Sequence, residues 1–220
     1  MKLFYNLQRG VGLLVFCTIL LSACVNHISE EEEDSVNNGD IPLKFTADIH
    51  EVTYTRVAGN GFEENDEVGV FALVGSSTMK EERYADNLRF FRTSEKVFES
   101  SEPIYYPDDE VTLRLISYYP YQEEGVNMGE STMSVAVETD QNLSAGYFCS
   151  DFLVASQNLQ SAPKGAIALH YDHKFFKLKI ALVGKEGEEL QGILDADPKL
   201  SVCGFYTKAI YDFQKETYSA

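Results

Sequence analysis

Few side chains in this 220-residue sequence have the spacing that chemically active groups need. His170 and His173 are the one close histidine pair, with Asp172 between them. Residues three apart on a strand point to opposite faces, so a shared metal would need a turn, and a strand end with satisfied imidazoles is the simpler interpretation. The acidic run 108–110 follows a proline and fits a turn better than a cation site. We therefore predict no metal, no cofactor and no catalytic residue.

Catalytic motifs are also missing from the sequence. It contains no HExxH, no CxxC pair, no GxSxG and no phosphate-binding glycine loop. With 35 acidic residues, some carboxylate pair meets any spacing, so glycosidase chemistry has no support. Several tyrosines could form a platform for a sugar, although packing within a sheet is the simpler role. They are Tyr105, Tyr106, Tyr118, Tyr119 and Tyr121. We expect a protein that is not an enzyme.

The composition narrows the class of partners. There are 18 basic and 35 acidic residues, for a formal charge of −17. Such a chain repels phosphate backbones, so nucleic-acid binding through a basic face is not expected. Hydrophobic residues make up 44% of the chain, enough for a packed core, and 12% aromatic residues favour strands over helices.

The first 23 residues have the features of an export signal. Lys2 and Arg9 precede an 11-residue apolar run, 11–21, which is too short to span a bilayer. The following Leu-Ser-Ala-Cys, 21–24, resembles the bacterial lipobox. We predict a lipoprotein signal peptide over 1–23 and acylation of Cys24, for example with palmitate, which would anchor the chain stably. Ordinary secretory cleavage is the alternative. Removal of the signal would take the formal charge from −17 to −19.

Residues 24–40 hold six acids and no base, which predicts an acidic flexible tether. A solvated spacer is the simplest interpretation, but an acidic run after a lipidated cysteine also resembles the surface-export signal of Bacteroides-type lipoproteins. Two cysteines remain in the body, Cys149 and Cys203. They could pair in a disulfide, and buried thiols in apolar segments are the alternative.

The body shows the two-residue period of β-strands. Residues 41–49 place Leu43, Phe45, Ala47 and Ile49 on one face. The continuous apolar run 68–74 predicts a central strand. Further strands are expected at 111–118, 133–137, 152–155, 167–171, 176–182 and 200–206. Turn signals separate them, so we predict an all-β fold, a mostly antiparallel β-sandwich.

A collinear series of motifs supports a closer comparison. It runs through Leu43-x-Phe45-x-Ala47, Thr55-Arg56, 65–71 (NDEVGVF), 84–87 (YADN), 104–107 (IYYP), 117–121 (SYYPY), 151–155 (DFLVA) and 173–180 (HKFFKLKI). Together with the lipobox, this series resembles the fimbrillin family, the Mfa-like and FimA-like lipoproteins that build type V pili in Bacteroides-type bacteria. The resemblance implies transthyretin-like sandwich domains: an N-terminal domain at 41–183 and an incomplete second β domain starting at 184–220, as in a C-terminally truncated copy or a short subunit.

The resemblance also implies a mechanism. An arginine-specific protease would cut the surface precursor between Arg56 and Val57, and loss of Leu43, Phe45, Ala47 and Ile49 would open a groove for a strand of the next pilus subunit. An ordinary loop arginine is the simpler interpretation of Arg56. We expect a lipid anchor in the outer membrane, surface exposure and, after processing, a place in extracellular fimbriae, with a host or bacterial surface ligand. The alternative is a surface lipoprotein that binds a glycan or host ligand without polymerising.

Overall fold

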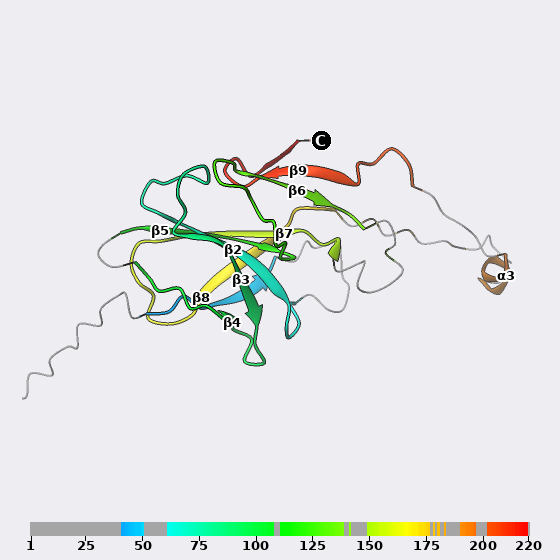
Figure 1. Cartoon of the computed structure of the whole chain (residues 1–220). Helices are drawn as coiled ribbons and strands as arrows, with labels where there is room; N and C mark the ends of the chain where they lie inside the picture. The colour runs from blue at the N-terminus through cyan, green and yellow to red at the C-terminus, as the bar shows by residue number, and fades with distance from the viewer. Residues whose placement is uncertain are drawn as a thin grey trace, which may run out of the picture. The chain divides into compact units, whose positions relative to one another are not determined.

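The computed structural model describes residues 41–50, 61–107, 111–138, 141, 149–176, 178, 180, 183, 190–196 and 202–219. This part of the chain is nearly all β (Figure 1). The strands are β1 (Phe45–Ile49), β2 (Glu67–Val74), β3 (Ala85–Arg92), β4 (Phe98–Ser100), β5 (Leu113–Tyr119), β6 (Thr132–Ala136), β7 (Leu153–Leu159), β8 (Ile167–His173), β9 (Lys208–Asp212) and β10 (Thr217–Ser219), with one short helix, α3 (Leu190–Asp195). The all-β prediction is confirmed. None of the described helices has the length and apolar character to cross a membrane.

Seven strands form a closed barrel in the order β1-β4-β3-β2-β5-β7-β8. All neighbours are antiparallel except β1 and β8, which run parallel over five residue pairs, from Phe45 opposite Ile167 to Ile49 opposite Tyr171. On its other side, β1 meets β4 at the single pair Phe45–Phe98. The sequence predicted a sandwich, but β1 bridges two strands that would otherwise be sheet edges and closes the sheet. A transthyretin-like arrangement stays a prediction.

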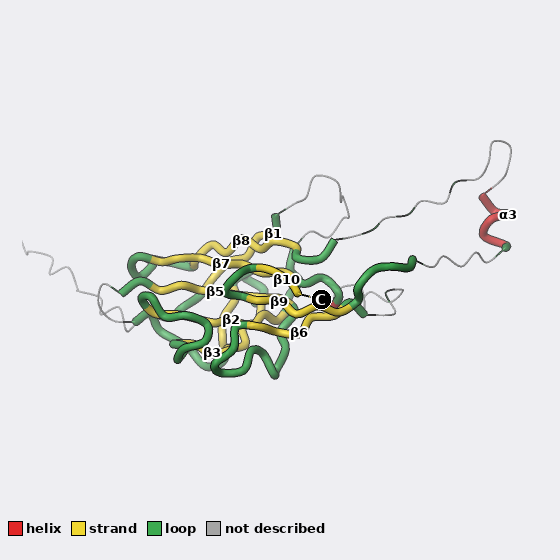
Figure 2. The backbone as a smooth tube through the Cα atoms, turned by 90° about the horizontal axis from the view of Figure 1, so that it is seen from above, coloured by secondary structure: helices red, strands yellow, loops and turns green. Residues whose placement is uncertain are grey.

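The remaining three strands form a second sheet in the order β10-β9-β6 (Figure 2). It packs against the outer face of β2, β5 and β7 through a buried cluster that includes Phe71, Tyr118, Val135 and Tyr211. The segment 184–220 therefore contributes β9 and β10 to the same compact unit as β6. The division into two domains at 183/184 stays a prediction.

Strand β2 is apolar on both faces because it lies between two cores. Val68, Val70 and Ala72 point into the barrel, whereas Phe71 and Leu73 pack under the second sheet. A strand covered on both sides is expected to have a continuous apolar sequence. The prediction of a central strand at 68–74 is confirmed.

A glycine in β2 allows a close approach between two strands. A Cβ on Gly69 would lie 2.2 Å from the ring of Tyr118, which sits opposite it on β5. The Tyr118 hydroxyl donates to the side chain of Asn87 at 2.7 Å and contacts the Gln122 carbonyl at 3.1 Å. The ring is thus fixed at its far end, so only glycine fits at position 69.

Arg83 holds the long connection between β5 and β6 in place. Its side chain is fully buried and donates to the carbonyls of Met79, Val126, Asn127 and Glu130 at 2.8–3.0 Å. It also pairs with Asp86 and lies over the ring of Phe71 at 5.2 Å. A buried guanidinium has five N–H donors and needs several acceptors held in fixed positions around it. Arg83 therefore links the loop around Met79 to the loop at 126–130.

Two expected strands are not found among the described residues. Phe176, Leu178 and Ile180 lie outside any strand and are 72%, 53% and 45% exposed. Residues 202–206 are likewise outside the strands. Conversely, β3 and β4 were not predicted, because four of the eight residues of β3 are polar and they do not alternate strictly with the apolar ones. An alternating pattern shows which residues share a face, but a strand forms only where a partner strand pairs with it.

Candidate functional site

The first strand of the body seals the barrel. Leu43 and Phe45 are 5% and 1% exposed, and Ala47 and Ile49 pack partly buried against the same core. All four residues named by the sequence therefore lie on the core face of this segment. Their role as an exchanged strand stays a prediction.

Phe45 makes the densest contacts of this strand. Its ring stacks on Phe98 of β4 with centroids 5.0 Å apart and lies 5.1 Å from Phe90 of β3. The main chain adds hydrogen bonds at both ends of the segment. The Leu43 amide donates to Ile104 and the His50 amide donates to Tyr171, both at 2.8 Å. The strand is held by one deep aromatic anchor and by its parallel pairing with β8.

Charged side chains line the solvent side of this strand. Lys44 pairs with Glu99 of β4 at 2.7 Å, and His50 Nδ1 lies 2.8 Å from the Asp172 carboxylate of β8. The hydrogen bond with His50 lowers the pKa of Asp172, and the nearby Lys174 adds to this effect. Both pairs are well exposed, so each stabilises the strand only modestly.

His170 and His173 have different neighbours in the structure. The ring of His170 stacks on His50 at 5.6 Å, whereas His173 Nδ1 lies 2.7 Å from the Asp151 carboxylate. Among the described residues, no group of three or more histidine, cysteine or acidic side chains is arranged to hold a metal. The acidic run 108–110 lies outside the described residues.

The arginines of the body differ in how they are held. Arg83 is buried, Arg89 and Arg92 lie in β3, and Arg114 lies in β5. Arg56 and Val57, the predicted cleavage position, lie outside the described residues, as does Cys24. Every described arginine is therefore part of a strand or buried, where a protease cannot easily bind its backbone.

The two body cysteines carry free, exposed thiols in the structure. The alternative of buried thiols is therefore wrong. The disulfide between Cys149 and Cys203 stays a prediction.

The tyrosines do not form a common sugar platform. Tyr106 is buried in the barrel core, and Tyr118 is fully buried in the cluster under the second sheet. Burial raises the pKa of the Tyr118 hydroxyl. Tyr105 is 42% exposed and accepts a hydrogen bond at its carbonyl from the Tyr84 hydroxyl. Sheet packing, the simpler role, describes Tyr106 and Tyr118.

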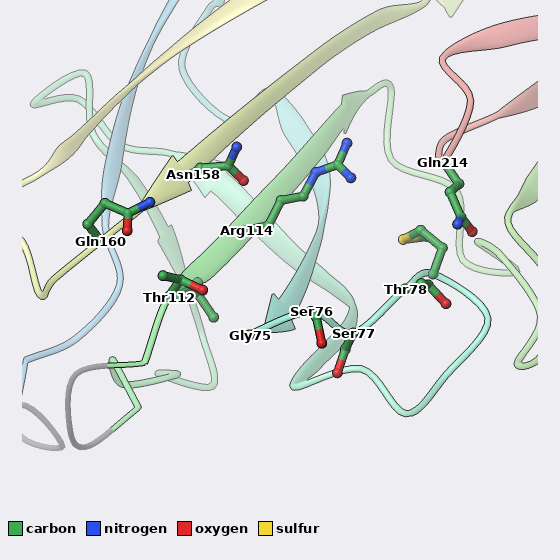
Figure 3. A pocket seen from close by; sticks show the side chains of 11 residues that line it. Gly75, Ser76, Ser77, Thr78, Thr112, Arg114, Asn158, Gln160 and Gln214 are labelled. Atoms are coloured by element: carbon green, nitrogen blue, oxygen red, sulfur yellow. The ribbon is translucent and has the colours of Figure 1, made fainter.

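A polar hollow lies on the outer face of the barrel, beside the turn between β9 and β10 (Figure 3). Its volume is about 290 Å³. Four segments far apart in sequence line it: Gly75, Ser76, Ser77, Thr78 and Met79; Thr112, Leu113 and Arg114; Asn158 and Gln160; and Gln214. Sequence reasoning missed this site. Its one local signal is the run Gly75-Ser-Ser-Thr78, which directly follows β2 and would have been taken for a turn.

Known proteins resemble this chain over most of its length. "Putative fimbrium subunit Fim1C" of Bacteroides uniformis is 24% identical over 216 residues, covering 93% of this chain and 65% of that protein. The chain thus spans about two-thirds of the length of that relative. A "putative cell adhesion protein" from Bacteroides ovatus has a TM-score of 0.46 and 17% identity, covering 60% of this chain and 52% of that one. A "fimbrial protein" from the same species has a TM-score of 0.36 and 21% identity, covering 62% and 28%.

A family model described as fimbrillin-like matches residues 55–220. The matched range begins after β1 and takes in every described strand from β2 to β10. The resemblance noted from the collinear motifs is thereby confirmed, and the chain belongs to the fimbrillin-like family.

Proposed function

We propose that the chain is the lipoprotein precursor of a pilus subunit or adhesin that assembles by protease-triggered strand exchange. The observation that carries this proposal is the position of β1. It is the first strand of the body, it closes the barrel, and only the segment 51–60 connects it to the rest of the fold. That segment contains Arg56.

Loss of β1 would leave a specific vacancy. Strand β8 would lose its partner over five residue pairs, and Phe98 and Phe90 would lose the ring of Phe45. An extended segment of another subunit with apolar residues at every second position would fit there. Main-chain hydrogen bonds would supply affinity, and the side-chain alternation would set the register.

The proposal includes the route to the cell surface. Residues 1–23 direct export, Cys24 receives the acyl chains that anchor the protein in the outer membrane, and residues 24–40 act as the tether. Metabolic labelling with palmitate tests this step. Full-length protein should incorporate label and the Cys24→Ser variant should not; equal labelling of both would contradict the anchor.

The processing step is tested with Arg56→Ala in the full chain, expressed in a fimbriated Bacteroides-type host. The unaltered chain should lose the mass of residues 24–56 and appear in surface polymers, whereas the variant should keep that mass and stay monomeric. Arg89→Ala is the matched control, because Arg89 is an exposed arginine of β3 and its loss should leave processing intact. Normal maturation of the Arg56→Ala chain would refute the proposal.

A second function is favoured by one observation, the polar hollow beside Arg114. A surface lipoprotein that binds a glycan without polymerising would need such a site. The two functions are separable, because polymer formation depends on Arg56 and ligand binding does not.

A further inference from the structure

The hollow is built where the two-layer packing ends. Arg114 of β5 lies directly opposite Asn158 of β7, and both point to the outer face of the barrel, as does Leu73, the residue of β2 opposite Arg114. One row further along, the same face carries Phe71 and Ile116, which are buried under the second sheet. The polar row thus begins where the covering sheet stops, and the turn with Gln214 forms one wall (Figure 3).

Most polar side chains of the hollow are free to form hydrogen bonds with a ligand. Within the described part of the chain, no hydrogen bond is formed by the side chains of Ser76, Ser77, Thr78, Thr112, Asn158, Gln160 or Gln214. Hydroxyls and amides both donate and accept. Because these side chains come from separate segments, they surround the hollow on several sides. Such an arrangement can form hydrogen bonds with several hydroxyl groups of one sugar ring.

The electrostatics favour a neutral ligand. Arg114 is the sole charged residue of the lining, and its guanidinium already pairs with Glu216 at 3.3 Å and contacts Ser156 at 3.3 Å. The whole chain carries a formal charge of −17, which repels anions at long range. A carboxylated or phosphorylated ligand would have to displace Glu216 against that field.

The volume and the lining of the hollow indicate the size of its ligand and the strength of binding. The volume of about 290 Å³ lies near the lower end of the roughly 300–1,000 Å³ of small-molecule sites and suits one sugar ring. The lining contains no aromatic residue, and its apolar members Met79 and Leu113 are buried. Binding without a stacking surface is weak for one site, but repeated copies on a polymer or a membrane would bind through avidity.

From these features we propose that the hollow binds a neutral saccharide unit through Ser76, Ser77, Asn158, Gln160 and Gln214. This inference deepens the second function above and rests on the chain being a surface protein. It does not depend on polymerisation, so it can fail or succeed separately from the Arg56 experiment.

The test is an NMR titration of the purified chain with three probes: methyl α-mannoside, methyl β-galactoside and methyl α-sialoside. A neutral glycoside should shift the amide resonances of residues 75–78 saturably in the millimolar range. Asn158→Ala and Gln160→Ala each remove an exposed amide and should weaken binding about tenfold together while leaving the fold intact. Gln191→Ala, an exposed amide on α3, is the matched control and should bind like the unaltered chain.

Three outcomes would overturn the proposal. The first is no saturable shift with either neutral glycoside. The second is binding that is insensitive to the Asn158 and Gln160 substitutions. The third is binding of the sialoside alone with loss on Arg114→Gln, which would make the hollow an anion site.

Discussion

The strength with which β1 is held can be tested at Phe45. Its ring is 1% exposed and stacks on Phe98 at 5.0 Å and near Phe90 at 5.1 Å. Truncation of a buried phenylalanine to alanine typically costs about 3–5 kcal/mol, because the hydrophobic free energy of the ring is lost and a cavity is left in the core. We expect Phe45→Ala to lower the free energy of unfolding by about 4 kcal/mol, which for a protein of this size is roughly 8–16 °C in Tm.

The assay is urea unfolding followed by circular dichroism, with Asp48→Ala as the matched control. Asp48 lies on the same strand but is exposed on the opposite face, so its replacement should change stability by less than about 0.5 kcal/mol. Amide exchange gives a second measurement. The Ile167 amide donates to the Lys44 carbonyl at 2.8 Å, and its protection should fall in Phe45→Ala along with stability.

A double-mutant cycle isolates the contact. Phe45→Ala and Phe98→Ala should be non-additive by about 1 kcal/mol, since stacked aromatic pairs contribute roughly 0.5–1.5 kcal/mol beyond their buried area. A cost below about 1 kcal/mol for Phe45→Ala would refute the anchoring role of this residue. Strict additivity would refute the stacked contact and leave only burial.

Three further substitutions give separate tests, each read from urea unfolding. Gly69→Ala should destabilise the fold by about 1–3 kcal/mol, because the new methyl group meets the fixed ring of Tyr118 at 2.2 Å, whereas Gly165→Ala, with no atom within 4 Å, should be neutral. Arg83→Lys should cost about 3 kcal/mol, because a lysine cannot reach the four carbonyls that the guanidinium satisfies; an unchanged midpoint would contradict this. Tyr211→Phe should leave stability at pH 7 unchanged or raise it by up to about 1 kcal/mol, because the buried Tyr211 hydroxyl has no hydrogen-bond partner among the described residues. A clear loss of stability would contradict this. Burial raises the pKa of Tyr211 from 10 to about 12, so its titration does not affect stability below pH 10. Between pH 10 and pH 12 the ionisation of Tyr211 favours the unfolded state, so Tyr211→Phe should reduce the alkaline loss of stability over that range.

The sequence predicted best where burial alone decides the pattern. Strand β2 was recognised because both of its faces are covered, and the face of β1 was recognised because one face is. Strand β3 was missed because it lies beside β2 with mostly polar or half-buried residues. The segment 176–182 has the clearest alternation of the chain, yet its described residues pair with no described strand. A strand forms only when another strand pairs with it, and the local sequence pattern does not show which strand that is.

The candidate sites show the same contrast. The apolar residues of β1 were found from their spacing, since that spacing is local. The polar hollow could not be found, because Ser76, Arg114, Asn158 and Gln214 meet only through the register of β5 with β7 and the turn after β9. Tyr118 was a candidate for sugar stacking because tyrosines are amphipathic, and only the second sheet shows that it is buried.

The parallel pairing of β1 with β8 has a consequence for the order of folding. The paired residues are 122 positions apart in the sequence, so this pairing closes a far longer loop of chain than any other strand pairing of the barrel. During synthesis the first strand is made early and must wait until residues 167–173 have followed. We expect the antiparallel core to form first and β1 to dock last, which leaves this position of the barrel open for longest to any competing strand.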